Sequence, residues 1–354
     1  MRYIGTLLDI KSFDLAELEA FLLKTGQPKF RARQIFKWLL SGVESFNEMT
    51  DIPKDLRNYL EQNCYLAKAE IFKRYKSDID ETVKYVFKMF DGELIESVLM
   101  KYEHGYSICI STQIGCRMGC KFCASGLNGL TRSLTASEML AQIITASKDN
   151  NIRISNVVMM GMGEPLDNFA NSAKFLKLVT EPEGLGIGLR HISLSTSGVV
   201  PGILKLKELA LPITLSVSLH APFDDLRRKI MPVARKWSIS ELLNACREYQ
   251  NKTTRRISFE YALIKGVNDT KECAEELCRI LKGIMCHINL IPANPVKENS
   301  FEKSDNKNIK KFKSFLESKG MNVTVRRTLG ADISASCGQL RKKVKEDECL
   351  DDFR

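Results

Sequence analysis

The feature that most constrains the fold is a repeated alternation of short apolar segments with amphipathic helical patterns. The apolar segments span residues 155–161, 190–198, 211–221, 256–264, 286–294 and 322–328. Clear helical patterns occur at residues 135–149, 169–180 and 239–250. Repeated strand–helix units favour a parallel sheet, in which functional groups gather at the carboxyl ends of the strands. With residues 106–112 as its first strand, the pattern predicts a partial or full α/β barrel.

Two other patterns precede this barrel. Helical periodicity with start and stop signals occurs at residues 14–26, 29–42 and 52–63. From Thr82 the apolar period changes to two, and Asp91-Gly92 is a strong hairpin signal between two strands. The predicted parts are a helical accessory domain at 1–75, a β-hairpin extension at 76–105, the barrel at 106–330 and a C-terminal segment with a basic tail at 331–354.

The charge of the chain is compatible with a polyanionic partner such as RNA. Of its 354 residues, 53 are Lys or Arg and 43 are Asp or Glu, which gives a net charge of +10. An ordinary solvated basic surface is the alternative. In the helical accessory domain the candidate RNA contacts are Arg31, Arg33, Lys37 and Lys54. In the barrel they are Arg227, Arg228, Lys229, Arg235, Lys236, Arg255, Arg256, Arg326 and Arg327.

The ends of the chain and its cysteines predict a cytoplasmic protein without a membrane partner. The first ten residues include Asp9, which a secretory signal does not favour. No apolar run approaches the ~20 residues that a membrane-spanning helix needs. The 11 cysteines are therefore expected to be mostly reduced thiols.

Three of these cysteines are crowded together, at Cys116, Cys120 and Cys123, with the spacing C-x3-C-x2-C. Thiolates select iron–sulfur clusters, zinc or Cu(I). A structural zinc ion normally has four protein ligands, so zinc here needs a distant fourth ligand such as His220. Three cysteines on a 4Fe-4S cluster instead leave one iron open to the amino and carboxylate groups of S-adenosylmethionine (SAM), whose reductive cleavage gives a radical. The spacing, with Phe122 before the last cysteine, favours the cluster.

This cysteine loop resembles that of the radical SAM superfamily, whose typical fold is a partial (β/α)6 barrel. The resemblance extends to Gly163 and Glu164, which look like the glycine-rich motif and acid that receive the SAM amino group; a plain strand-to-helix turn is the alternative. Further cofactor-binding candidates end the third, fourth and sixth strands: Ser195, Ser218, Leu219, His220 and Asn294. The polar members of this set suit ribose, carboxylate or adenine contacts. His220 as a core histidine and Asn294 as a turn residue are the alternatives.

A larger set of motifs resembles the RlmN family of adenine-C2 RNA methyltransferases. These motifs are CISTQIGCRMGCKFC, GMGEPLDN, SLSTSGVVP, SVSLHAP, LIPANP and GADISASCGQL, and the match runs from about Glu96 to Leu340. The helical start, with KFRARQIFKWL and MTDIPKDLR, is similar to the accessory domain of that family. The resemblance implies methylation of an adenosine in 23S rRNA and in tRNA, and a monomeric enzyme that needs a reductase or flavodoxin as electron donor.

The resemblance also implies a mechanism that uses two SAM molecules per turnover. One SAM methylates a cysteine that matches Cys337, and the second gives the radical that removes hydrogen from this methyl group. The carbon radical adds to the adenine ring, and a base that matches Glu96 takes the C2 proton. A second thiol, which matches Cys109, then releases the RNA by forming a disulfide with the first. We therefore expect Cys337 to lie in a mobile loop over the barrel mouth.

Three other functions are compatible with parts of the sequence. A Cfr-like enzyme would methylate adenine at C8 with related chemistry, although Pro165 and the long helical start favour the C2 family. A radical enzyme that acts on a peptide or small molecule would have no need of Cys109, Cys337 or the basic excess. A non-catalytic iron–sulfur RNA-binding protein would not require the polar strand ends.

Overall fold

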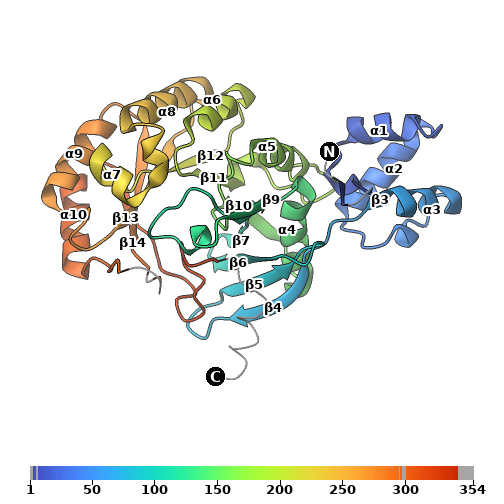
Figure 1. Cartoon of the computed structure of the whole chain (residues 1–354), viewed down its shortest axis with the longest axis horizontal. Helices are drawn as coiled ribbons and strands as arrows, with labels where there is room; N and C mark the ends of the chain where they lie inside the picture. Colours follow the sequence, from blue (N-terminus) through green and yellow to red (C-terminus); the bar gives the residue numbers. More distant parts are fainter. Residues whose placement is uncertain (1–2, 5–6, 295, 297–299, 342–354) are drawn as a thin grey trace.

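A ten-stranded, strongly curved sheet forms the centre of the molecule in the computed structural model, which describes residues 3–4, 7–294, 296 and 300–341 (Figure 1). From one edge to the other, the strands are β15 (Val323–Val325), β14 (Cys286–Pro292), β13 (Ile257–Leu263), β12 (Thr214–Ser218), β11 (Ile192–Thr196), β10 (Ile154–Met159), β7 (Gly105–Cys109), β6 (Leu94–Tyr102), β5 (Val83–Lys88) and β4 (Glu70–Lys76). Neighbouring strands are parallel from β15 along the sheet as far as β7. From β7 to the other edge, neighbouring strands are antiparallel. The radical SAM-type α/β architecture that the sequence predicts is therefore confirmed.

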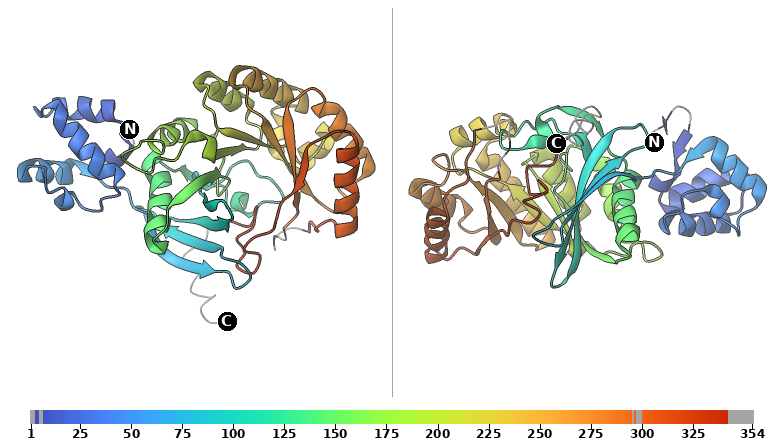
Figure 2. Two further views of the ribbon diagram at one scale, coloured as in Figure 1. Left: turned by 180° about the vertical axis from the view of Figure 1, so that it is seen from behind. Right: turned by 90° about the horizontal axis from the view of Figure 1, so that it is seen from below.

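Helices pack along the outside of the curved sheet (Figures 1 and 2). They are α4 (Ala136–Asn150), α5 (Phe169–Leu178), α6 (Val200–Leu209), α8 (Ile239–Thr253), α9 (Lys271–Leu281) and α10 (Asn306–Ser318). Local sequence signals fix several of their starts. Thr135 and Glu138 form a reciprocal capping box at the start of α4, and Ser238 and Glu241 do so at the start of α8. The apolar faces of these helices cover the outer face of the sheet and complete one continuous core.

The N-terminal helices form a separate lobe beside the sheet (Figure 2). They are α1 (Leu15–Leu23), α2 (Lys29–Leu40) and α3 (Lys54–Asn63), and a small sheet of β1 (Tyr3–Ile4), β2 (Leu7–Asp9) and β3 (Cys64–Tyr65) lies next to them. None of the helices in the described part of the chain is long and apolar enough to cross a membrane.

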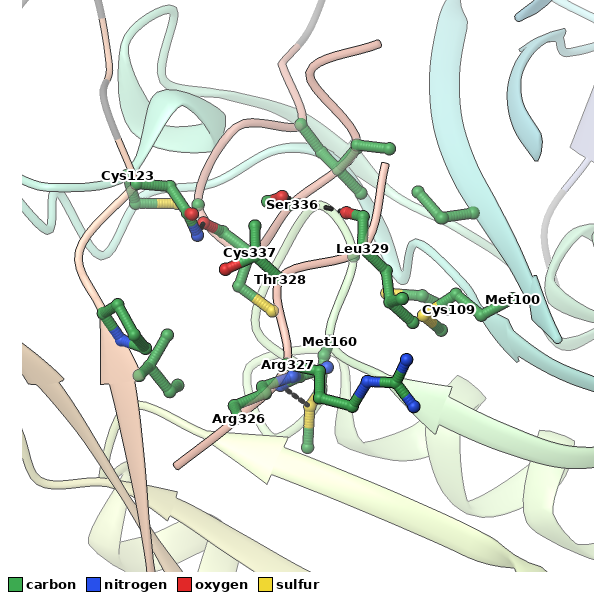
Figure 3. A pocket seen from close by; sticks show the side chains of 18 of the residues that line it. Met100, Cys109, Cys123, Met160, Arg326, Arg327, Thr328, Leu329, Ser336 and Cys337 are labelled. Carbon is green, nitrogen blue, oxygen red and sulfur yellow. Dashed lines mark hydrogen bonds between the residues drawn. The ribbon is translucent and has the colours of Figure 1, made fainter. Parts of the chain in front are cut away.

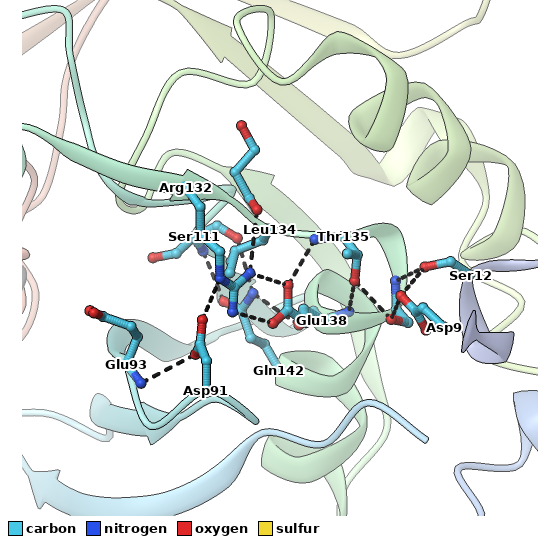
Figure 4. A network of polar contacts seen from close by, with 12 residues as sticks. Asp9, Ser12, Asp91, Glu93, Ser111, Arg132, Leu134, Thr135, Glu138 and Gln142 are labelled. Carbon is cyan, nitrogen blue, oxygen red and sulfur yellow. Dashed lines mark hydrogen bonds and ion pairs between the residues drawn. The ribbon is translucent and has the colours of Figure 1, made fainter. Parts of the chain in front are cut away.

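Buried polar contacts fasten this lobe to α4 (Figure 4). Asp9 Oδ2 accepts hydrogen bonds from Ser12 Oγ and Ser137 Oγ, both at 2.7 Å. Burial raises the pKa of Asp9, and these hydroxyl donors oppose that rise. On the other side of the same helix end, the Arg132 guanidinium contacts Glu138 at 2.7 Å and Asp91, in the β5–β6 turn, at 2.6 Å.

Most predicted segments form the expected elements, with one correction near the start. The sequence predicts helices up to about residue 75, but β1, β2 and β3 lie in this range and residues 70–76 form the edge strand β4. Exposure alternates along β4, as in a strand, but the sequence does not, because the apolar Phe72 is exposed and Lys73 is half-buried. Residues 106–112 do not remain a strand throughout, because β7 ends at Cys109. The basic tail after Arg341, including Cys349, lies outside the described residues.

Candidate active site

The cysteine loop leaves the sheet after β7 and is closed at its base by two short strands, β8 (Gln113–Gly115) and β9 (Leu130–Ser133). Gly115 has φ +76°, and a Cβ atom on it would lie 1.9 Å from the carbonyl oxygen of Gly129. Only glycine fits this position, because both the backbone conformation and the space exclude a side chain. The Cys116 N–H donates to the same Gly129 oxygen at 2.9 Å. The start of the cysteine loop is thus held rigidly at the mouth of the barrel.

All three cysteines of the loop line one cavity of about 1060 Å³, counted with its open mouth, which we call the cysteine cavity. Its other walls come from the carboxyl ends of β10 to β14 and from the segment after β15. Of the cofactor-binding residues proposed from sequence, it is lined by Gly163, Glu164, Ser195, Ser218, His220 and Asn294. The exception is Leu219, which is fully buried in the hydrophobic core. The fold therefore gathers every polar candidate of that set at one site.

Gly163 and Glu164 are shaped by a contact with the strand that leads into the cysteine loop. The Glu164 N–H donates to Gln113 Oε1 at 2.9 Å. Gly163 has φ +104°, and a Cβ atom there would lie 2.6 Å from Gln113 Cβ, so a larger residue cannot keep this contact. The Glu164 carboxylate accepts from the Leu166 N–H at 3.0 Å and the Ser197 N–H at 2.6 Å. Burial raises the pKa of Glu164, and these backbone donors oppose the rise.

His220 faces the cavity as a neutral imidazole. Its Nδ1 accepts a hydrogen bond from the Ala262 N–H at 2.9 Å, and its ring packs edge-on against Phe122, with the centroids 4.8 Å apart. Burial and the nearby Arg227 charge lower its pKa to about 3. In addition, no three His, Cys, Asp or Glu side chains among the described residues are grouped closely enough to hold a single metal ion. A zinc site completed by His220 is not formed here.

The donor set fits an iron–sulfur cluster better than one ion. Cys116, Cys120 and Cys123 surround the cavity from one loop, and a cluster keeps its cysteine ligands farther apart than a single ion does. Burial raises the pKa of the Cys116 thiol to about 12 and raises that of Cys120 well above its ordinary value. Metal coordination deprotonates thiols, so a bound cluster supplies the compensation that the buried thiolates need.

A second, smaller cavity adjoins the first, and we call it the thiol pocket (Figure 3). It is lined by Cys109, at the end of β7, and by Cys337, in the segment after β15. Cys123 and Cys337 line both cavities. Burial and the neighbouring Cys337 raise the pKa of Cys109 to about 12. All cysteines in the described part of the chain are free thiols, so this structure holds the reduced pair.

The segment that carries Cys337 has no helix or strand between β15 and Arg341. Hydrogen bonds nevertheless hold it on the cysteine loop: the Ala124 N–H donates to the Gly338 oxygen at 2.7 Å, and Ser125 Oγ donates to the Leu340 oxygen at 2.6 Å. Asp332 accepts from Ser77 Oγ in the β4–β5 loop at 2.8 Å. The segment is therefore a loop, as the sequence predicts, and its mobility stays a prediction; its contacts join it to the cysteine loop and to the β4–β5 loop.

Glu96 does not line either cavity. It lies on β6 with 1% of its surface exposed, and its carboxylate contacts Lys84 Nζ at 3.5 Å. The other oxygen accepts from the Arg341 N–H at 2.8 Å. Because side chains alternate along a strand, Glu96 shares a face of β6 with Val98, which does line the thiol pocket. The C-terminal segment thus contacts the Glu96 carboxylate through Arg341, next to Leu340, which lines the thiol pocket.

Several residues of the site were not found by sequence reasoning. Gln113 orients Glu164, and Glu260, an acid within an apolar strand, lines the cysteine cavity and accepts from Asn289 Nδ2 at 2.7 Å. The signal for Glu260 was present, because a carboxylate inside a parallel core strand is unusual. The signal for Gln113 was absent, because the contact depends on packing between β8 and the loop after β10.

Two arginines that were predicted to contact RNA have other positions. Arg326 lines both cavities instead of lying on the surface, and Cys337 and Glu260 raise its pKa while burial opposes them. Arg227 is wrong as a phosphate contact, because its side chain is fully buried. Charged residues in a basic run are usually solvated, so nothing in the local sequence separates these two from their exposed neighbours.

Comparisons with known proteins agree with this geometry. Residues 110–279 match the Radical SAM superfamily, and residues 8–66 match the Ribosomal RNA large subunit methyltransferase N-terminal domain. The chain is 52% identical over 335 residues to the probable dual-specificity RNA methyltransferase RlmN of Clostridium novyi, which covers 94% of this chain and 98% of that protein. It is 52% identical over 336 residues to the protein of the same name from Alkaliphilus oremlandii, which covers 95% and 98%.

A solved structure supports the same relationship. The crystal structure of a radical SAM methyltransferase from Sphaerobacter thermophilus superposes with a TM-score of 0.89 at 44% identity, covering 94% of this chain and 99% of that one. The similarity spans the N-terminal lobe, the barrel and the cysteine loop together, and superfamily membership implies a 4Fe-4S cluster and SAM as cofactors. The chain therefore belongs to the RlmN family of radical SAM methyltransferases.

Proposed function

We propose that this protein methylates C2 of an adenosine in 23S rRNA and in tRNA through a methyl-cysteine intermediate. The observation that carries the proposal is that Cys109 and Cys337, which lie far apart in sequence, line one pocket that shares a wall with the cysteine cavity. A radical generated in one cavity then has a methyl-bearing sulfur within reach in the other. The names of the relatives, which describe dual-specificity RNA methyltransferases, support RNA as the substrate.

The cofactors are assigned to the cysteine cavity. We assign Cys116, Cys120 and Cys123 as the cluster ligands. A bound 4Fe-4S cluster would supply the electron that cleaves SAM to a carbon radical. For SAM we assign Gly163 and Glu164 to the amino group, with Ser195, Ser218, His220 and Asn294 on the remaining groups. Leu219 can contribute only through its backbone, because its side chain is in the core.

The two thiols have different tasks in this scheme. The Cys337 sulfur attacks the methyl group of one SAM molecule, a sulfur–carbon bond forms, and the thiol proton and S-adenosylhomocysteine leave. After a second SAM molecule has served to remove one hydrogen atom, the methylene carbon bonds to adenine C2. The adduct then loses the C2 proton to a base and one electron, which a bound cluster oxidised by SAM cleavage would accept. The Cys109 thiol gives up its proton and attacks the Cys337 sulfur, their disulfide forms as the carbon–sulfur bond breaks, and the released carbon takes the bonding electron pair and a proton to become the methyl group. A reductase or flavodoxin must supply electrons for the cofactor, and the disulfide needs reduction before the next turnover.

Glu96 is the base that we assign to the C2 proton. For this task the C-terminal segment must leave it, because the Arg341 N–H now occupies one carboxylate oxygen. Displacement of the segment when RNA enters would expose the base only in the substrate complex. This coupling would keep the base away from water in the free protein.

RNA binding is consistent with the exposed basic side chains near the cavity. Arg228, Lys229, Arg235 and Lys236 are exposed, and Met231 between them lines the cysteine cavity. Phosphates held here would lie close to the mouth, and a target base flipped from its stack can enter it. We further propose that the enzyme acts as a monomer in the cytoplasm, where reducing conditions keep thiols free.

Mass spectrometry of nucleosides from 23S rRNA and tRNA tests the proposal. RNA from cells that have this protein should contain 2-methyladenosine, and RNA from cells that lack only this protein should not. Appearance of 8-methyladenosine would indicate the Cfr-like reaction instead. If the methyladenosine content of the RNA is the same with and without the protein, the protein is not an RNA methyltransferase of either kind.

A further inference from the structure

A fully buried arginine lies behind the wall of the cysteine cavity, and the scheme above gives it no task. Arg227 lies on the short helix α7 (Asp224–Ile230) and is 0% exposed. Its Nε donates to the Leu219 oxygen at 3.0 Å. Its Nη2 donates to the Ser197 oxygen at 2.6 Å and the Ser218 oxygen at 3.1 Å. One guanidinium thus joins the carboxyl ends of β11 and β12, whose serines face the cavity.

The charge of this side chain is not balanced by a carboxylate. In the described part of the chain, Arg227 forms no ion pair, and its Nη1 is buried without a hydrogen-bond partner. Burial lowers the pKa of Arg227 to about 10, and Cys120 and Asp224 oppose this, so the side chain stays cationic at neutral pH. An isolated buried charge is costly, and a fold that keeps one requires an anion nearby in its working state.

The nearby groups identify that anion. Arg227 donates to the backbone oxygens of Ser197 and Ser218, both of which line the cysteine cavity. Its neighbour Leu226 packs against the same hydrophobic cluster as Cys120. His220, which also lines the cavity, is a base that can carry only a positive charge or none, so it cannot balance the arginine. A 4Fe-4S cluster held by three thiolates is anionic and becomes more negative when it is reduced. The net charge around such a cluster is one of the factors that set its reduction potential.

We propose that Arg227 is a positioning residue whose fixed positive charge balances the cluster and makes its reduction easier, while its donors hold the SAM-facing ends of β11 and β12. The inference rests on the proposed function, because it requires a cluster on Cys116, Cys120 and Cys123. It predicts that charge at this position controls the cluster potential, whereas hydrogen-bonding geometry controls SAM affinity. The two effects are separable by substitution.

The test compares four anaerobically reconstituted variants with the wild-type protein. Arg227→Lys keeps the charge and loses the forked donor, Arg227→Met removes both, and Arg227→Gln is neutral but keeps a donor for the Ser197 oxygen. Arg247→Gln is the control, because Arg247 is an exposed arginine on α8 that donates to Asn244 and has no role in the scheme. For each protein, iron content, the cluster midpoint potential from an EPR-monitored titration, and SAM affinity are measured.

We expect the two neutral variants to retain iron. Their cluster midpoint potential should be more negative than that of the wild type by at least about 59 mV, which corresponds to a tenfold change in the equilibrium constant for one electron. Arg227→Lys should keep the wild-type potential but bind SAM more weakly, and Arg247→Gln should match the wild type in iron content, potential and SAM affinity. Neutral variants with full iron and an unchanged potential would overturn the inference. The inference would also be overturned if the cluster-free neutral variants did not fold while cluster-free Arg227→Lys did. Arg227 would then serve only to stabilise the fold. A wild-type protein that takes up no cluster would instead contradict the proposed function.

Discussion

Asn294 Nδ2 donates a hydrogen bond to the backbone oxygen of Cys337 at 3.0 Å. Asn294, two residues after the end of β14, lines both cavities, and this contact joins it to the loop that carries the proposed methyl acceptor. An asparagine assigned to SAM from its position in the sequence therefore also positions the sulfur that SAM would methylate. In the proposed scheme this one side chain would couple SAM binding to the placement of Cys337.

We expect Asn294→Ala to slow methylation of Cys337 without loss of the cluster. Loss of one hydrogen bond costs about 1 kcal/mol, which corresponds to a roughly fivefold slower first methyl transfer. Mass spectrometry of the Cys337 peptide after a single turnover measures this rate at saturating SAM. Asn244→Ala, an exposed change on α8, is the control. An unchanged methylation rate in Asn294→Ala would show that the loop does not depend on this contact.

The sequence predicted the barrel and its site well because both depend on local patterns. Alternating apolar strands and helices define the parallel sheet, and Cys116, Cys120 and Cys123 lie within one loop. Prediction from the sequence failed for side chains whose positions depend on packing between distant segments. The burial of Arg227 depends on three carbonyl groups from two strand ends, and the position of Glu96 depends on a loop about 245 residues later in the chain. Neither arrangement leaves a periodic signal.

Gly163→Ala should abolish SAM binding and destabilise the protein. The left-handed conformation costs a side chain about 1–2 kcal/mol. The contact with Gln113 adds ~1–3 kcal/mol, because a Cβ atom would lie 2.6 Å from Gln113 Cβ. Gly283→Ala is the matched control, since Gly283 has φ +81° with open space around it. Urea unfolding and SAM titration measure the two effects. Equal destabilisation of both variants would contradict the packing argument.

Cys120→Ala should lose the cluster and the formation of 5′-deoxyadenosine while keeping the fold. The side chain faces the cysteine cavity, so its removal leaves no void in the core. Cys246→Ala should do the reverse, because Cys246 is fully buried in the core, and its loss should lower stability but preserve iron content. Iron analysis and thermal unfolding distinguish the two. A Cys120→Ala protein with a full cluster would contradict the ligand assignment.

The ion pair between Asp14 and Lys177 should make the attachment of the N-terminal lobe pH-dependent. Asp14 Oδ2 contacts Lys177 Nζ at 2.8 Å, and Asp14 also caps α1 by accepting from the Glu17 N–H at 2.9 Å. Partial burial raises the pKa of Asp14, but these contacts outweigh it and hold the pKa below 3.8. Because the folded-state pKa is depressed, the stabilisation is present above pH 3.8 and is lost as the pH falls through the folded-state value.

Asp14→Asn separates the charge from the cap, since asparagine caps a helix as well as aspartate does. The variant should be less stable than the wild type by under about 1 kcal/mol at neutral pH, because the pair is partly exposed. The difference should shrink as the pH is lowered into the range where aspartate becomes protonated. Urea denaturation across this pH range measures it. A difference that stays constant or grows with acidity would show that the pair is not its cause.

The central claim, that Cys337 and Cys109 act in sequence on one RNA base, is tested most directly by the fate of RNA in Cys109→Ala. Reconstituted Cys109→Ala protein is incubated with SAM, reductant and labelled substrate RNA, and the products are separated on a denaturing gel. We expect RNA covalently linked to the protein through Cys337, no released methylated RNA, and no adduct in Cys337→Ala or in the double variant. Cys286→Ala, a buried cysteine outside the thiol pocket, should release methylated RNA normally. Full release of methylated RNA by Cys109→Ala, with no RNA-linked protein, would contradict the account.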